Sequence, residues 1–148
     1  MKLSKKGRYG IRALIDLAVY SRDTHVSLNS IAERNNISPQ FLEQVFASLR
    51  RAGIVRSIKG PQGGYLLSSE PENITVASIL EVLEGNYLVE NEEIPKEGTS
   101  YASSLTMQEL VIDTVNTKLN GILQNLTLAD LEKSYMKKVS QSQDMYYI

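Results

Sequence analysis

Cysteine is absent from this chain of 148 residues, and only one histidine, His25, is present. The absence of cysteine excludes disulfide bonds, thiolate-ligated zinc, cysteine-held iron–sulfur clusters and cysteine nucleophiles within this chain. His25 lies in the polar stretch SRDTHVS, where we expect a surface loop rather than a metal or catalytic site. Because so few side chains suit nucleophilic or metal chemistry, we expect neither an enzyme nor a bound metal or cofactor.

Long apolar runs and enzyme motifs are also missing. No stretch approaches the roughly 18 apolar residues that span a bilayer. The basic start, MKLSKKGRYG, leads into an amphipathic pattern rather than the apolar core of a signal peptide. The sequence therefore predicts a soluble, cytoplasmic protein without a membrane partner. It contains no P-loop, HExxH or dinucleotide-binding GxGxxG motif, so these enzyme classes have no support.

Charge is divided unevenly along the chain, although the net charge is only −1. Residues 1–67 contain eleven Lys or Arg and four Asp or Glu, a net charge of +7. Residues 68–148 contain five basic and thirteen acidic residues, a net charge of −8. A basic front half favours a polyanion-binding module joined to a segment with a different role.

Three amphipathic helices are predicted in the basic half. Apolar residues at helical spacing predict a first helix over about residues 4–20 and a second over about residues 27–35. In the following stretch, SPQFLEQVFASLRRAG, Ser38 is a good N-cap, Pro39 suits the first helical position and Gly53 ends the helix. The second and third helices form a helix-turn-helix. The exposed face of the third helix is polar and nearly free of acid, which suits a DNA major groove; it carries Gln40, Gln44, Ala47, Ser48 and Arg51.

A β-hairpin is predicted next, in the segment IKGPQGGYLL at residues 58–67. Strands over about residues 54–58 and 65–67 flank a turn rich in glycine and proline. A hairpin directly after a helix-turn-helix is the element order of a winged helix. We expect Lys59 to enter a narrow minor groove, and the bare backbone at Gly60 and Gly63 to approach phosphates.

The acidic half is predicted to contain a loop between helices. The stretch ITVASILEVLEG predicts a short helix between a Thr75 cap and Gly85, and residues 86–103 lose periodicity and gather acid, Pro and Gly. A last helix is expected from residue 126 to about residue 139.

The longest predicted helix covers residues 104–126, with a capping box at Thr106 and Glu109. Its heptad-like apolar stripe is wider than a small domain needs, which favours a dimerisation helix over packing within one chain. The predicted fold is mainly α with a small β-hairpin: a winged-helix DNA-binding domain at 1–85, a loop at 86–103, and a dimerisation helix with a C-terminal helix and tail at 104–148. The predicted dimerisation residues are Leu105, Ile112, Val115, Leu119, Ile122 and Leu126.

The segments MKLSKKGRYGIRALIDLA, ISPQFLEQVFASLRRAGIVRSIKGPQGGYLL and ITVASILEVLEG resemble the Rrf2 family of bacterial transcription regulators. The resemblance implies a homodimeric winged-helix protein that binds an imperfect palindrome in double-stranded promoter DNA. It implies phosphate contacts at the start of the chain, base or backbone contacts from the third helix, and a minor-groove contact from the wing. The matching positions are Ser4, Lys6, Arg8, Tyr9, Ser38, Gln40, Phe41, Glu43, Gln44 and Lys59. Two of these have a structural alternative: Phe41 as a core residue and Glu43 as a solvated or wing-supporting carboxylate.

The sequence departs from the cluster-binding members of that family. Those members carry three cysteines in the interval that corresponds to NYLVENEEIPKEGTSYASS here, which contains none. The C-terminal residues Tyr146, Tyr147 and Ile148 instead resemble the end of the family's cysteine-metabolism repressors, which lack these cysteines. That resemblance implies a repressor of cysteine or sulfur metabolism genes whose tail binds cysteine synthase (O-acetylserine sulfhydrylase). The alternatives are docking of the tail on its own dimer, a regulator of other genes that senses an unknown small molecule, and a winged-helix adaptor that contacts protein.

Overall fold

The front of the molecule is built from three helices that each begin after a serine. A computed structural model describes residues 1–146, with side chains through residue 143. Helices α1 (Lys5–Tyr20), α2 (Leu28–Asn35) and α3 (Pro39–Arg51) follow Ser4, Ser27 and Ser38, and each serine side chain accepts a hydrogen bond from the backbone N–H three residues later. Serine is a favoured N-cap because it satisfies a free N–H of the first turn. The predicted starts of these helices are confirmed to within about one residue.

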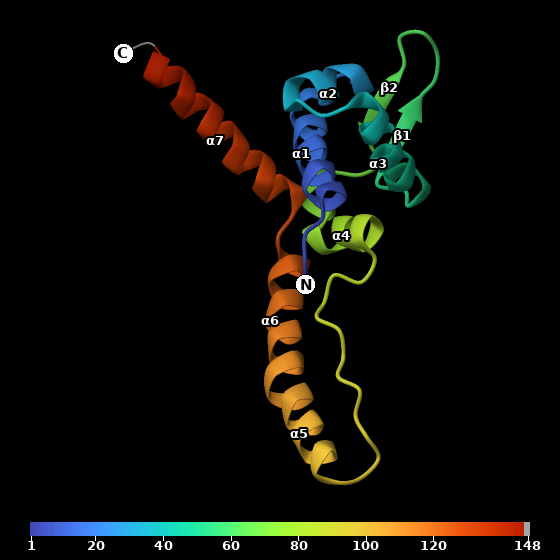
Figure 1. Cartoon of the computed structure of the whole chain (residues 1–148). Helices are drawn as coiled ribbons and strands as arrows, with labels where there is room; N and C mark the ends of the chain where they lie inside the picture. The colour runs from blue at the N-terminus through green and yellow to red at the C-terminus, as the bar shows by residue number, and fades with distance from the viewer. Residues whose placement is uncertain (147–148) are drawn as a thin grey trace.

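Helices α1 to α3 pack with α4 (Val76–Glu84) around one apolar core (Figure 1). The residues predicted to face inward on α3, namely Leu42, Val45, Phe46 and Leu49, are all buried. Helix α4 lies close against α1 because two positions of α1 facing it are glycines. A Cβ at Gly10 would collide with Leu83, and one at Gly7 would collide with the Glu84 carboxylate. The helix-turn-helix is therefore supported from behind by α4.

A buried ion pair joins α1 to α2. Asp16 is only 4% exposed, and Arg34 donates from Nε and Nη2 to its two carboxylate oxygens at 2.8 and 2.7 Å. Asn35 Nδ2 donates to the same carboxylate at 3.1 Å. A buried carboxylate needs such partners, because removing it from water without them is costly. These contacts fix the orientation of α2, and the sequence did not predict them.

The hairpin has the predicted antiparallel form. Strands β1 (Val55–Ile58) and β2 (Gly64–Leu67) pair in a register from Val55 opposite Leu67 to Ile58 opposite Gly64. Its root is attached to the helices, since the backbones of Val26 and Tyr65 exchange hydrogen bonds at 3.0 and 2.8 Å. The wing therefore has a fixed base beside the helix-turn-helix.

A rod of three helical pieces extends below this front body (Figure 1). It consists of α5 (Thr99–Met107), the single π-helical turn η2 (Gln108–Ile112) and α6 (Asp113–Asn125). The prediction that this helix begins at residue 104 is wrong, because α5 starts directly after Gly98, whose φ of 94° breaks the helix. The predicted capping box is also wrong, since Thr106 lies inside α5 and its hydroxyl donates to the Ala102 carbonyl at 2.7 Å.

Residues 86–92, called the strap from here on, are attached to the rod by side-chain amides. Asn116 binds both backbone groups of Val89: its Oδ1 accepts from the Val89 N–H at 2.8 Å and its Nδ2 donates to the Val89 carbonyl at 2.9 Å. The remaining strap contacts are Tyr87 Oη to Asn120 Oδ1 (2.6 Å), Glu92 N–H to Gln108 Oε1 (2.7 Å) and Gln108 Nε2 to Asn91 Oδ1 (3.0 Å). One face of the rod is therefore covered by its own chain.

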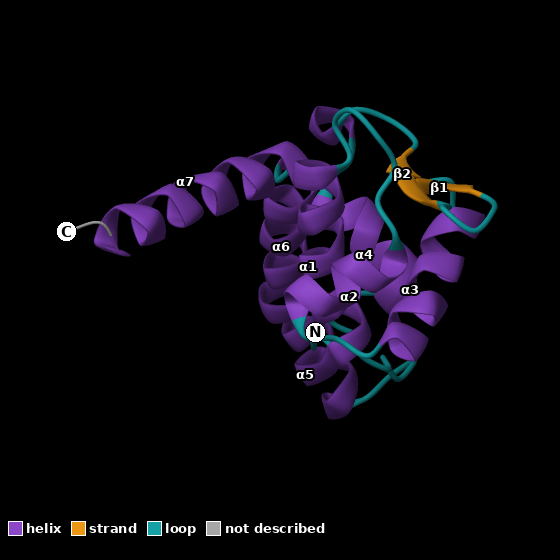
Figure 2. Cartoon of the chain, turned by 90° about the horizontal axis from the view of Figure 1, so that it is seen from above, coloured by secondary structure: helices purple, strands orange, loops and turns teal. Residues whose placement is uncertain are grey.

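The last helix, α7 (Leu128–Tyr146), is longer than the predicted segment. It begins with a capping box in which the Thr127 N–H donates to Asp130 Oδ2 at 3.0 Å and the Asp130 N–H donates to Thr127 Oγ1 at 3.2 Å. The backbone N–H of Thr127, and after it the Thr127 side chain, stabilise the ionised carboxylate of Asp130 and lower its pKa. The buried Leu128 and Glu132, with Leu131 between them, attach the first turns of α7 to the body, and the C-terminal part of the helix projects away on the side opposite the wing (Figure 2).

The 3-10 turn η1 (Pro71–Asn73) connects the wing to α4. Beside it, Arg22 of the segment after α1 forms an ion pair with the buried Glu132 of α7. Within residues 1–146, no helix is both long enough and apolar enough to cross a membrane.

Candidate nucleic-acid interface

Helix α3 presents one side to the core and the other to solvent. Gln40, Glu43, Gln44 and Arg51 are exposed, while Ser48 is half-buried beside them. Glu43 is the one acidic residue within Pro39–Arg51. This arrangement leaves hydrogen-bonding side chains on a helix face that can enter a groove about as wide as a helix.

Two cations meet in the last turn of α3. Lys6, from the first turn of α1, donates from Nζ to Ser48 Oγ at 3.3 Å, and Arg51 Nη2 donates to the same oxygen at 3.4 Å. Ser48 Oγ itself donates to the Gln44 carbonyl at 3.3 Å. Two positive charges around one neutral hydroxyl repel each other, so an anion between them would be stabilised. The fold thus brings Lys6 of α1 against Ser48 and Arg51 of α3.

The remaining predicted residues at the start of the chain have contacts within the protein. Ser4 caps α1, and its hydroxyl also donates to Glu84 Oε1 at 2.5 Å. Arg8 Nε donates to the Leu3 carbonyl at 2.9 Å. The Ser4 hydroxyl is therefore engaged in joining α1 to α4, and its predicted contact with phosphate remains a prediction.

The two aromatic residues predicted at the interface contact each other. Tyr9 and Phe41 pack edge to face with ring centroids 5.7 Å apart, and Phe41 is half-buried against the core. The Arg12 guanidinium lies 5.4 Å from the centre of the Tyr9 ring, and its Nη2 donates to the Asn35 carbonyl at 2.7 Å. Phe41 therefore has the core contact that was its structural alternative. Arg12 was not among the predicted DNA contacts. The sequence feature that could have indicated it is its place among the other basic residues in the first part of α1.

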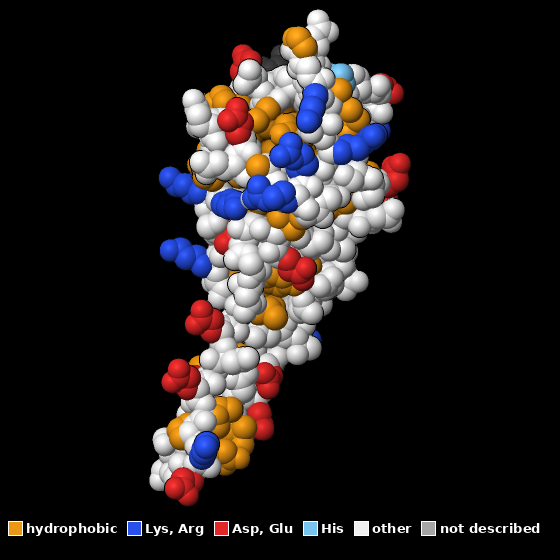
Figure 3. All heavy atoms as spheres, turned by 90° about the vertical axis from the view of Figure 1, so that its right-hand side faces the viewer, with side chains coloured by type: hydrophobic (Ala, Val, Ile, Leu, Met, Phe, Trp, Pro, Cys, Tyr) orange, Lys and Arg blue, Asp and Glu red, His pale blue; other side chains and the backbone are white. Residues whose placement is uncertain are grey.

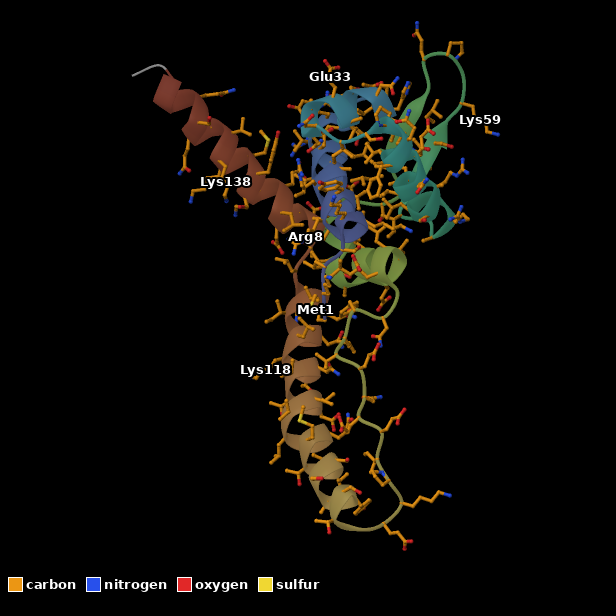
Figure 4. All side chains as sticks on the ribbon, viewed as in Figure 1. Met1, Arg8, Glu33, Lys59, Lys118 and Lys138 are labelled. Carbon is orange, nitrogen blue, oxygen red and sulfur yellow. The ribbon has the colours of Figure 1, made fainter. Side chains whose placement is uncertain are left out.

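The wing tip carries a single basic residue. Lys59 is exposed, and its side chain points away from the body of the protein (Figure 4). The turn glycines also have intramolecular roles: Gly60 has a φ of 117°, and a Cβ at Gly63 would collide with the Ile58 carbonyl. His25, predicted on a surface loop, is partly exposed, and its Nε2 lies 2.5 Å from the Gln62 carbonyl, so it supports this turn. Turn closure is sufficient to require glycine here, and an approach of phosphates to Gly60 and Gly63 remains a prediction.

Charge is separated along the long axis of the molecule. Figure 3, which faces the side of α3 and the wing, shows Lys and Arg gathered on the upper body and Asp and Glu along the lower rod. A polyanion would be attracted to the upper part and repelled by the lower part. The basic and acidic halves of the sequence therefore also lie at different ends of the folded molecule.

The predicted dimerisation residues lie on more than one side of the rod. Val115 and Ile122 are 45% and 63% exposed, whereas Ile112 is 4% exposed within its own chain. The other three, Leu105, Leu119 and Leu126, are half-buried. Further exposed apolar residues on the rod are Met107, Leu110 and Val111.

Comparison with known proteins gives full-length relatives. The HTH-type transcriptional regulator CymR of Bacillus subtilis is 41% identical over 152 residues, covering 100% of both chains. The HTH-type transcriptional regulator IscR of Vibrio campbellii is 32% identical, covering 98% of this chain and 86% of that relative. The solved structure of CymR (YrzC), the global cysteine regulator of B. subtilis, matches with a TM-score of 0.77 and 39% identity, over 90% of this chain and 98% of that chain.

The family model that matches residues 3–134 is Rrf2, iron-dependent transcriptional regulator. The residues present do not fit a cysteine-ligated iron site, because the chain has no cysteine. Within the part of the chain that the structure describes, no three His, Asp or Glu side chains group as metal ligands either. The match over most of the length and the CymR-like fold nevertheless agree with the winged-helix interface described above. The chain belongs to the Rrf2 family of transcriptional regulators.

Proposed function

We propose that this transcription regulator is a homodimer that recognises an imperfect palindrome and represses cysteine or sulfur metabolism genes without an iron–sulfur cluster. The observation that carries DNA recognition is the convergence of Lys6 and Arg51 on Ser48, in the last turn of a helix whose exposed face has a single acidic residue. A phosphate between these cations would hold α3 in the major groove. Lys59 would contact the adjacent minor groove from the wing tip.

The proposed dimer uses the side of the rod that the strap leaves open. Val115 and Ile122 are exposed apolar residues seven positions apart, two turns of α6, so they lie on one side of the helix. Exposed apolar side chains in a row favour burial against a second copy, because burial removes apolar surface from water. Two recognition helices would then read two half-sites one or more helical turns apart.

The proposed regulon rests on the likeness to CymR. This chain matches CymR over its whole length, and the name of the solved relative describes a global cysteine regulator. The IscR relatives leave open a regulator of other genes that senses an unknown small molecule. Genomic footprinting of the purified protein on its own chromosome tests the choice: sites should gather upstream of cysteine and sulfur genes, and sites elsewhere would contradict this regulon.

Cysteine synthase is the proposed protein partner, on the resemblance of the C-terminal residues. Tyr146 is the last residue of α7, and the side chain of Tyr146 and all of Tyr147 and Ile148 lie outside what the structure describes. A free carboxylate with an apolar side chain would occupy a substrate-like pocket of the enzyme. Calorimetry should show synthase binding by the full chain and none by a form lacking Ile148. Equal affinity of both forms would contradict the tail mechanism and leave DNA binding untouched.

A further inference from the structure

Ser38 makes two hydrogen bonds at the start of α3, one with the backbone and one with a side chain. Its Oγ accepts from the Phe41 N–H at 3.4 Å, which is the helix cap. It also lies 3.0 Å from Gln40 Oε1. A hydroxyl has one hydrogen to give, and because the cap bond uses an acceptor position, that hydrogen is free to be donated to the Gln40 oxygen. One residue therefore begins the helix and binds the side chain two positions on.

This bond determines which atoms Gln40 can offer to a partner. Ser38 occupies one of the two acceptor positions of the Gln40 amide oxygen, whereas both N–H donors of the NH₂ group stay free. Gln44 is exposed one turn later, and within the described residues no hydrogen bond holds its side chain. Gln44 can therefore turn either its oxygen or its NH₂ group outward, whereas Gln40 has both donors free and one of its two acceptor positions occupied.

We propose that Ser38 is a positioning residue for base recognition, which sets Gln40 to read a base with acceptor atoms on its major-groove edge. This rests on the DNA recognition proposed above. Guanine offers two acceptors there, N7 and O6, whereas cytosine offers only a donor, N4–H. A freely turning glutamine would favour adenine, because adenine pairs with the oxygen and the NH₂ group together. Because Gln40 has both donors free and one acceptor position occupied, it favours guanine at the position it faces.

Two substitutions of Ser38 separate this role from helix capping. Ser38→Gly keeps the cap nearly intact but frees Gln40, because glycine is also an acceptable N-cap. Ser38→Asp keeps the cap as well, but a carboxylate only accepts, so it would hold the Gln40 NH₂ group and turn the oxygen outward. Thermal unfolding and circular dichroism of both variants establish that the fold is retained.

Selection of duplexes from a randomised library, followed by anisotropy on single operator variants, tests the proposal. The base position that loses preference in Gln40→Ala defines where Gln40 reads. There the unsubstituted protein should favour guanine over adenine by about fivefold, the worth of one hydrogen bond. Ser38→Gly should shift the preference to adenine, and Ser38→Asp should shift it toward cytosine or adenine, whose N4–H or N6–H can donate to the outward oxygen.

The readout is the ratio of affinities for operators that differ only in the base at this position. Absolute affinity is not used, because the added charge of Ser38→Asp weakens binding to every sequence alike. The same base preference in all three proteins, or no preference lost in Gln40→Ala, would overturn the role of Ser38. A protein that shows no sequence preference at any position would instead refute the proposed DNA recognition.

Discussion

Lys59 stands apart from the other basic residues of the interface. Lys6 and Arg51 meet on α3, whereas Lys59 is carried by the tip of the wing. Lys59→Ala should weaken binding to all sequences and reduce the slope of log affinity against log salt by about 1, because one phosphate contact releases about one counterion. Fluorescence anisotropy over a salt series measures both quantities.

Lys96→Ala is the matched control for Lys59→Ala, since Lys96 is an exposed lysine in the acidic half. The control should leave the salt slope unchanged, and Lys59→Arg should keep it. A Lys59→Ala protein with an unaltered slope would show that the wing tip does not reach the DNA.

At the scale of single residues, local features could be predicted from the sequence and long-range contacts could not. The cap at Ser38 follows from local chemistry, so it could be read directly. The bond from Lys6 to Ser48 joins residues 42 positions apart, and the sequence carries no signal for such a contact. The Asp16–Arg34 pair was missed for a related reason, because Asp16 reads as a solvated charge until the fold buries it.

The strap is an element whose attachment depends on a few amide groups. Asn116 makes two hydrogen bonds to Val89, each worth about 1 kcal/mol in net stability. Asn116→Leu should therefore ease local opening of the strap by about 1–2 kcal/mol, because the part-buried N–H and carbonyl of Val89 lose their partner. Hydrogen exchange at residues 87–92 should speed up accordingly.

Gln124→Leu serves as the comparison for Asn116→Leu, because Gln124 is an exposed amide on the same helix, α6. It should leave exchange in the strap unchanged. Equal exchange in the Asn116→Leu and unsubstituted proteins would mean that the contacts of Tyr87 and Gln108 hold the strap without Asn116.

In the acidic half, the presence of the helices could be predicted from the sequence, but the residues at which they begin and end could not. Residues 99–103 (TSYAS) show no apolar periodicity, so the sequence does not indicate that they are helical. In the structure, α5 begins at Thr99 because the backbone of Gly98, with a positive φ, separates the helix from the preceding loop. The π-helical turn at Gln108–Ile112 was not predicted. The Gln108 side chain at its start binds Asn91 and Glu92 of the strap, and the sequence carries no signal for these long-range contacts.

At the scale of the whole molecule, the rod should control assembly. A double variant, Val115→Glu with Ile122→Glu, places charges on the exposed apolar side and should give monomers. Operator affinity should fall sharply in the same variant, since two linked half-sites bind far more tightly than one. Light scattering at micromolar concentration measures the mass.

Gln124→Glu is the control for assembly, because it lies nine residues from Val115, on the opposite side of α6. It should leave a dimer. An unsubstituted protein that remained a monomer under these conditions would contradict the proposed dimer, whatever its affinity for DNA.

The central claim is sequence-specific DNA recognition by the α3 face and the wing, and one binding measurement tests it most directly. The full chain is titrated by anisotropy with the duplex upstream of its own gene and with a scrambled duplex of equal length and composition, at physiological salt. We predict that the upstream duplex binds at least about 1,000-fold more tightly, within the range of specific regulators. Equal affinity for the two duplexes would contradict the account.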